Sequence, residues 1–280
     1  MQDSQQLRPF MGARFTAAKS AQRWAGRVGV AIGLVAVVVV LVPESVAWVA
    51  WGGGILSVVL VVAQQYLLYR FRKAYSEAEE IRRLCMVSSG LGSRIPAVEM
   101  ASLRRRFGCL EDKHEDPYYT SHLEPGPKRL LMLTWESAFW SEDLQEHLAS
   151  KLWRRAAVTT LLFSVAVVVA LVGPEGPVVP KVVVASLSFL VGLNFWGKWW
   201  DAKQTERACR ETAASCRSRV QDGVTCTSEL DELREVMQVV LGYCATLQTA
   251  EPPPDKLYEQ RKPILDAEWA KVAEEVPGGG

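Results

Sequence analysis

Residues 153–200 read WRRAAVTTLLFSVAVVVALVGPEGPVVPKVVVASLSFLVGLNFWGKWW. Two apolar arms, Ala156 to Val172 and Val182 to Trp196, flank a turn rich in glycine and proline. Each arm approaches or reaches the roughly 20 residues that cross a bilayer of about 30 Å as a helix. Backbone groups in lipid must pair within the chain, so helices are expected here despite the many valines. The stretch predicts a transmembrane hairpin, with tryptophan, lysine and arginine marking the membrane interfaces.

A second hairpin precedes this one in the chain. Trp24 to Val42 leads to the turn Pro43-Glu44-Ser45, and Val46 to Leu68 returns to a basic end. Small residues spaced four apart in its first arm would let a neighbouring helix approach closely; they are Ala25, Gly29 and Gly33.

The predicted fold is therefore an all-α membrane protein with two transmembrane hairpins, cytoplasmic helical stalks and a small cytoplasmic cap. Residues 1–23 form a cytoplasmic N-terminal segment, for which a solvated leader is favoured over an amphipathic helix on the membrane surface. The other parts are the first hairpin (24–69), the stalk and cap (70–152), the second hairpin (153–200) and a cytoplasmic helical tail (201–280).

Charge placement predicts the orientation. The chain has 32 basic and 31 acidic residues, a net charge of +1, so bulk electrostatics does not point to DNA or RNA. Only Lys181 among the basic residues sits on a hairpin tip, and the positive-inside rule then puts both termini and the middle segment in the cytoplasm. The six cysteines fall in these cytoplasmic parts without C-x-x-C spacing, so we expect reduced thiols.

Apolar stripes predict helices outside the membrane. A stripe at spacings of three and four continues the second arm into a stalk that ends at about Val87, before Ser88-Ser89-Gly90; its members are Phe71, Ala74, Ala78, Ile81 and Cys85. A short helix with a basic face is expected over Ala97 to Phe107. An amphipathic helix over Leu130 to Leu152 leads into the third arm.

The tail carries a coiled-coil-like seam, with apolar residues alternately four and three apart: Cys226, Leu230, Leu233, Met237, Val240, Cys244 and Leu247. Such a seam needs a partner helix, either the first stalk or a neighbouring subunit. After Pro252-Pro253-Pro254, a last helix is expected from about Ile264 to Glu275.

Enzyme chemistry is not expected, and neither is a cofactor. His114, Glu115, Asp116, His122 and Glu124 form a local cluster, but its spacing matches no metal-site signature, and solvated loop residues are favoured. No phosphate loop or nucleophile motif occurs. The run Glu142, Asp143, Glu146 and His147 is interpreted as the wet face of a helix.

A coupled transporter is disfavoured because the centres of the arms hold only small polar groups. A pore formed by several copies needs no buried charge, since polar stripes would line it after assembly; the candidates are Ser57, Gln64, Thr160, Ser164, Ser186 and Asn194. The alternative is that the hydroxyls bond to their own helices and the hairpins merely anchor the protein.

The middle segment resembles a known family. The resemblance is carried by an aromatic pair, a basic turn and a polar helix start: Tyr118-Tyr119, Gly126-Pro127-Lys128-Arg129-Leu130, and Glu136-Ser137-Ala138-Phe139-Trp140 with Leu144. These residues look like the signature between the hairpins of SMODS-associated four-transmembrane effectors. The order of hairpin, stalk, motif, hairpin and helical tail is similar too, over nearly the whole chain.

This resemblance implies a bacterial anti-phage effector of the inner membrane. A cyclic oligonucleotide made by a neighbouring nucleotidyltransferase would drive assembly or opening, and so depolarise the infected cell. Arg104, Arg105, Arg106, Lys128 and Arg129 would then meet phosphates, while Tyr118 and Tyr119 stack on bases. The alternative reading packs the tyrosines at the membrane face and puts the basic residues on lipid headgroups.

The function expected is thus a ligand-gated, membrane-disrupting homo-oligomer. The first alternative is a non-pore scaffold or sensor that recruits a partner through the seam of the tail, and the second is a small transporter subunit.

Overall fold

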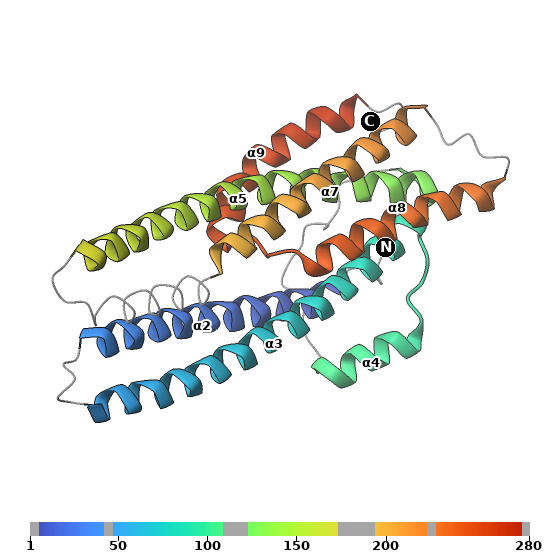
Figure 1. Cartoon of the computed structure of the whole chain (residues 1–280). Helices are drawn as coiled ribbons and strands as arrows, with labels where there is room; N and C mark the ends of the chain where they lie inside the picture. The colour runs from blue at the N-terminus through green and yellow to red at the C-terminus, as the bar shows by residue number, and fades with distance from the viewer. Residues whose placement is uncertain (1–5, 42–46, 109–122, 173–193, 223–227, 276–280) are drawn as a thin grey trace. The chain divides into compact units, whose positions relative to one another are not determined.

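The computed structural model describes residues 6–41, 47–108, 123–172, 194–222 and 228–275 (Figure 1). All regular structure in these ranges is helical, which confirms the predicted all-α class. In chain order the helices are α2 (Arg8–Leu41), α3 (Ala47–Leu91), α4 (Ala97–Phe107), α5 (Pro127–Val172), α7 (Phe195–Asp222), α8 (Glu229–Thr249) and α9 (Asp255–Glu274).

The chain divides into two compact units. The core unit comprises Met1–Thr16, Ala74–Leu148 and Asp201–Gly280, and the apolar unit comprises Ala17–Lys73 and Ala149–Trp200. Helices α2, α3, α5 and α7 each contribute residues to both units without interruption. The ranges 24–69 and 153–200, expected as hairpins, fall inside the apolar unit.

The core unit is a helical bundle around one main hydrophobic cluster. Met86 of α3, the start of α5 from Leu130, and one face each of α7 and α8 supply most of its buried side chains, and Trp269 of α9 completes it. The predicted stalk stripe from Phe71 to Cys85 is buried, so its periodicity correctly identified the inner face of α3.

The predicted seam of the tail lies on helix α8, and part of it packs against other helices of the same chain. Ser228 caps its start, since the Ser228 side chain accepts a hydrogen bond from the Asp231 backbone N–H. The C-terminal half of the seam, Val240, Cys244 and Leu247, is buried in the same cluster as Met86 of α3. Met237 also packs against this cluster, whereas Leu230 is 78% exposed, and Cys226 lies outside the described residues.

A second cluster corrects the prediction for the N-terminal segment. The favoured solvated leader is wrong from residue 6 onward, because α2 begins at Arg8 and Leu7, Phe10 and Met11 are buried. They pack with Ile81 and Cys85 of α3, Leu103 of α4 and Ile95, which lies between these two helices. Apolar side chains scattered among basic ones were too weak a pattern to predict this packing.

Two predicted helix ends are also wrong. Helix α3 runs through Ser88-Ser89-Gly90 and ends at Leu91. The next residue, Gly92, has a φ of 65°, outside the helical range. Gly90 is needed for packing, since a Cβ there would lie 2.7 Å from the Leu130 Cα of α5. Helix α9 starts at Asp255, not near Ile264. The proline expected to precede the helix, Pro263, lies inside it at an exposed position.

The apolar unit exposes most of its large side chains. Trp48, Trp51, Ile55 and Leu162 are 65–77% exposed. Among the residues that the structure describes, two helices are long and apolar enough to cross a membrane, Arg8–Val39 and Trp51–Leu91, and only 6% of the most apolar stretch of the second is buried. The third expected span lies on α5, whereas most of the fourth lies outside the described residues.

Candidate functional site

The residues predicted to bind a ligand stand on two different helices of the core unit. Tyr118 and Tyr119 lie outside the described residues, so their stacking role stays a prediction. Arg104, Arg105 and Arg106 form the last turn of α4 and are exposed, over the second cluster. By contrast, Lys128 and Arg129 begin α5, next to Leu130 of the main cluster.

An arginine cluster, formed by Arg14, Glu77, Arg106 and Phe107, joins three segments. The Glu77 carboxylate of α3 pairs with Arg14 of α2 and with Arg106 of α4, whose Nη2 lies 2.7 Å from Oε1. Both guanidinium groups also lie over the Phe107 ring, 4.7 and 5.1 Å from its centroid. The basic run on α4 was visible in the sequence, but Arg14 and Glu77 were missed because they are far from it along the chain.

The candidate pore residues of α3 are largely covered. Ser57 is half-buried, and Gln64 is only 9% exposed although nearby residues of α3 in the apolar unit, such as Val62 and Tyr66, are exposed. Polar side chains buried in an apolar unit commonly hydrogen-bond between membrane helices. The pore-lining role of Ser57 and Gln64 stays a prediction.

The other candidate pore residues differ in environment. Thr160 of α5 accepts a hydrogen bond from the Trp196 indole of α7 at 3.0 Å, so its hydroxyl ties two helices. Ser164 is exposed, and Asn194, with a φ of 45°, directly precedes α7. Ser186 lies outside the described residues. The pore-lining role of these residues stays a prediction.

Three aromatic residues near the start of α5, Trp135, Phe139 and Trp140, pack against α9. The centroid of the Trp269 ring lies 5.5 Å from that of Trp135, which it meets edge to face, and 5.7 Å from that of Phe139. The ring centroids of Trp140 and Tyr258 are 5.9 Å apart. Such aromatic pairs bury large areas with preferred geometry. Of the residues that carry the family resemblance, Phe139 and Trp140 therefore have a packing role within the chain.

The charged run that follows the motif is not simply a wet face. Asp143 receives two hydrogen bonds from Arg261 of α9, at 2.8 and 2.5 Å, and Glu142 pairs with Arg210 of α7 at 2.7 Å. Only Glu146 is exposed, as predicted. These pairs connect α5 to α7 and α9, which the sequence of one helix could not reveal.

A buried polar network links α3, α5 and α8 inside the core unit. Arg82 Nε lies 2.9 Å from Glu79 Oε2, and Arg82 Nη1 donates to Ser137 Oγ at 3.3 Å. The Tyr243 hydroxyl donates to Ser137 Oγ at 2.9 Å and bonds to Ser141 Oγ at 2.9 Å. The Arg82 guanidinium also lies over the Tyr243 ring, 5.6 Å from its centroid.

Burial dominates the ionisation of this network. It raises the pKa of the Glu79 carboxyl, although Arg82 and a hydrogen bond from Tyr75 oppose the shift. It also raises the pKa of the Tyr75 and Tyr243 hydroxyls, which stay neutral donors. The arrangement is suited to fixing helices against one another.

The cysteines offer no activated nucleophile among the described residues. Burial raises the pKa of the Cys85 thiol to about 11 and that of the Cys209 and Cys216 thiols to about 12, and Cys244 is shifted in the same direction. All four are buried thiols that form no disulfide. The described ranges also contain no group of three potential metal ligands, and of the predicted His/carboxylate cluster only Glu124 falls within them, exposed.

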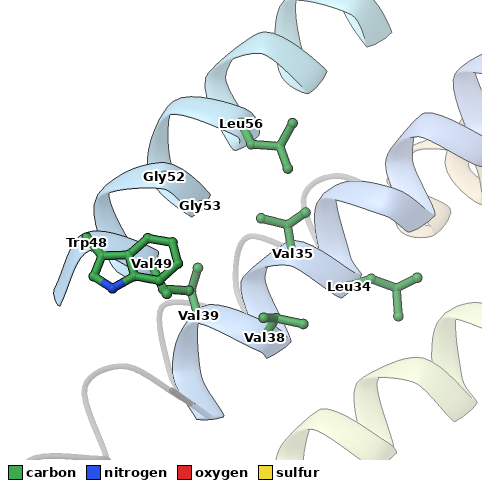
Figure 2. Close-up of a pocket in the computed structure, with 9 residues that line it drawn as sticks. All are labelled: Leu34, Val35, Val38, Val39, Trp48, Val49, Gly52, Gly53 and Leu56. Carbon is green, nitrogen blue, oxygen red and sulfur yellow. The ribbon is translucent and has the colours of Figure 1, made fainter. Parts of the chain in front are cut away.

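An apolar pocket of about 350 Å³ lies between α2 and α3 in the apolar unit (Figure 2). Gly53 brings the helices together there, because a Cβ at this position would lie 2.3 Å from Val39 Cγ2. The lining is wholly nonpolar: Leu34, Val35, Val38, Val39, Trp48, Val49, Gly52, Gly53 and Leu56.

Over the described ranges, fold and contacts thus define a helical protein with a hydrophobic core, a buried polar network within it, and two helices long and apolar enough to span a membrane. Comparison with family models found no match, and comparisons with curated proteins and with solved structures found none either.

Proposed function

We propose that the protein is a ligand-gated, membrane-disrupting effector that acts as a homo-oligomer in the bacterial inner membrane. Its termini and middle segment face the cytoplasm, and the activating ligand is a cyclic oligonucleotide. The outcome is loss of membrane potential and death of the infected cell. The anti-phage role rests on the resemblance of the middle segment, and the membrane role rests on the helices.

The observation that carries the membrane role is the continuity of α2 and α3. Each is one helix with an exposed apolar part in the apolar unit and a buried part in the core unit. A ligand that prefers one arrangement of the core unit would shift the population of that arrangement. Because the same helices supply the candidate spans, such a shift has a direct covalent route to the membrane.

The scaffold alternative has weaker support. It relied on the seam of the tail as a free recruitment surface, but Val240, Cys244 and Leu247 are buried within the chain. The exposed Leu230 and Leu241 remain as a smaller surface.

The decisive experiment measures membrane potential in bacterial cells that express the protein with a panel of cyclic di- and trinucleotide synthases. We expect depolarisation that requires one particular nucleotide. Tyr118→Ala with Tyr119→Ala should abolish it in protein that still reaches the membrane, while the control Tyr258→Ala on α9 should not. An unchanged potential, with every nucleotide shown to accumulate, would refute the effector proposal.

A further inference from the structure

The arginine cluster is built around a single carboxylate. Glu77, whose side chain is 12% exposed, is shared by Arg14 and Arg106, so these three groups carry a net charge of +1. Arg106 keeps 47% of its side chain exposed, which leaves its outer edge open to solvent. On α4, Arg104 and Arg105 add two further exposed positive charges beside it.

The cluster is held in place before any ligand arrives. Phe107 orients both guanidinium groups through cation–π contacts, and Phe10 of α2 packs against Phe107 with ring centroids 6.3 Å apart. Arg104 Nη2 donates to Gln6 Oε1 at 3.3 Å. Side chains already ordered in this way lose less conformational entropy when they bind.

Two guanidinium forks that converge on one pair of oxygens match the chemistry of a phosphate group. We propose that Arg14 and Arg106 bind the phosphate of a ligand that competes with Glu77 for them, with Arg104 and Arg105 strengthening the attraction. Glu77 thus acts as a built-in competitor. The ligand is either the phosphodiester of a cyclic oligonucleotide or the headgroup phosphate of an anionic lipid; the first source rests on the proposed function.

Phosphate binding would change what holds α2. In the structure described, Arg14 ties the first turns of α2 to Glu77 of α3. A phosphate that takes over Arg14 and Arg106 weakens that tie and leaves Glu77 without them. Since α2 and α3 both supply candidate spans, this exchange would reach the membrane segments.

The test uses the full chain purified in phosphatidylcholine nanodiscs and measures its affinity for labelled cyclic di- and trinucleotides. In parallel, native mass spectrometry of detergent-purified protein counts retained phosphatidylglycerol against phosphatidylcholine. Arg106→Gln should weaken phosphate binding about tenfold, because a charge-assisted hydrogen bond is lost. Glu77→Gln should strengthen it by a similar factor, because the competitor is removed.

Arg217→Gln, at an exposed arginine of α7, is the matched control and should leave both affinities unchanged. Circular dichroism checks the fold, and Arg106→Lys, which keeps the charge but loses the fork, replaces Arg106→Gln if that variant unfolds. A purely structural ion pair predicts that Glu77→Gln strengthens neither kind of binding, and this result in folded protein overturns the proposal. Nucleotide or lipid binding identifies the source, and either can occur without depolarisation, so the site and the proposed effector function fail separately.

Discussion

Arg82 illustrates how much one side chain can hold together in a helical bundle. It pairs with Glu79 on its own helix, donates to Ser137 of α5 and lies over the Tyr243 ring of α8. Both charged partners are nearly enclosed, with Arg82 11% and Glu79 5% exposed in their side chains. A buried pair of this kind costs desolvation, and its main benefit is a unique arrangement of the helices.

This balance gives a residue-scale prediction. Arg82→Met should destabilise the protein by about 3–5 kcal/mol, because the buried Glu79 then loses its salt-bridge partner and keeps only the hydrogen bond from Tyr75 to offset its burial. The double variant Glu79→Leu with Arg82→Met should recover most of that loss. Urea unfolding of detergent-solubilised protein measures both values.

Arg83→Met, at the half-buried neighbouring arginine, serves as the control and should change the free energy of unfolding much less. A double variant as unstable as Arg82→Met alone would mean that the network stabilises the bundle by itself and does not merely specify it.

At the scale of elements, α9 is a helix fastened along α5. Trp269 is 5% exposed and packs between Trp135 and Phe139, while Arg261 holds Asp143 with two hydrogen bonds. Trp135, Phe139 and Trp140 of α5 therefore all pack against aromatic rings of α9.

Trp269→Ala should lower the free energy of unfolding by about 3–5 kcal/mol, because it empties a large volume in the main cluster. Tyr258→Ala, on the same helix but at a side chain that is 40% exposed, should cost far less. The same urea titration compares them. Equal losses would show that α9 is not anchored by Trp269.

Sequence patterns predicted where the helices of this protein lie along the chain better than they predicted the contacts between those helices. The stripe from Phe71 to Cys85 identified the buried face of α3, because periodicity records which side of a helix avoids water. The end of α3 was predicted before Gly90, but the helix continues because Gly90 packs closely against Leu130. The start of α9 was predicted after Pro263, but the helix tolerates this proline at an exposed position.

The arginine cluster and the buried network were not predictable in the same way. Tyr243 and Ser137 are 106 residues apart, and Arg14 and Glu77 are 63 apart. Each residue alone looks like an ordinary polar position on a helix, and only the tertiary arrangement gives it a partner. The predicted roles of Tyr118 and Tyr119 lie outside the described residues and stay predictions.

For the whole molecule, the difference between the two units predicts how each tolerates charge. Val62 of the apolar unit is 64% exposed and Val98 of the core unit is 80% exposed, so both are open on the folded chain. Val62→Arg should nonetheless impair membrane insertion, at a cost of about 2.5–3.5 kcal/mol for arginine near the centre of a span. Val98→Arg should have no such effect.

Alkaline carbonate extraction of membranes, with quantification of the retained protein, distinguishes the two variants. If Val62→Arg were retained as fully as Val98→Arg, the exposed face of α3 would not lie in lipid, and the membrane proposal would lose its main support.

The continuity of α2, α3, α5 and α7 across both units has a consequence for how such a chain can evolve. Each residue of an α-helix turns the chain by about 100°. One residue gained or lost between Lys73 and Ala74 would therefore rotate the exposed apolar face of α3 out of phase with its packed face. Changes of about seven residues nearly restore the phase. We therefore expect length variation among descendants of this sequence to accumulate between helices, and to enter the four continuous helices only in steps close to whole turns.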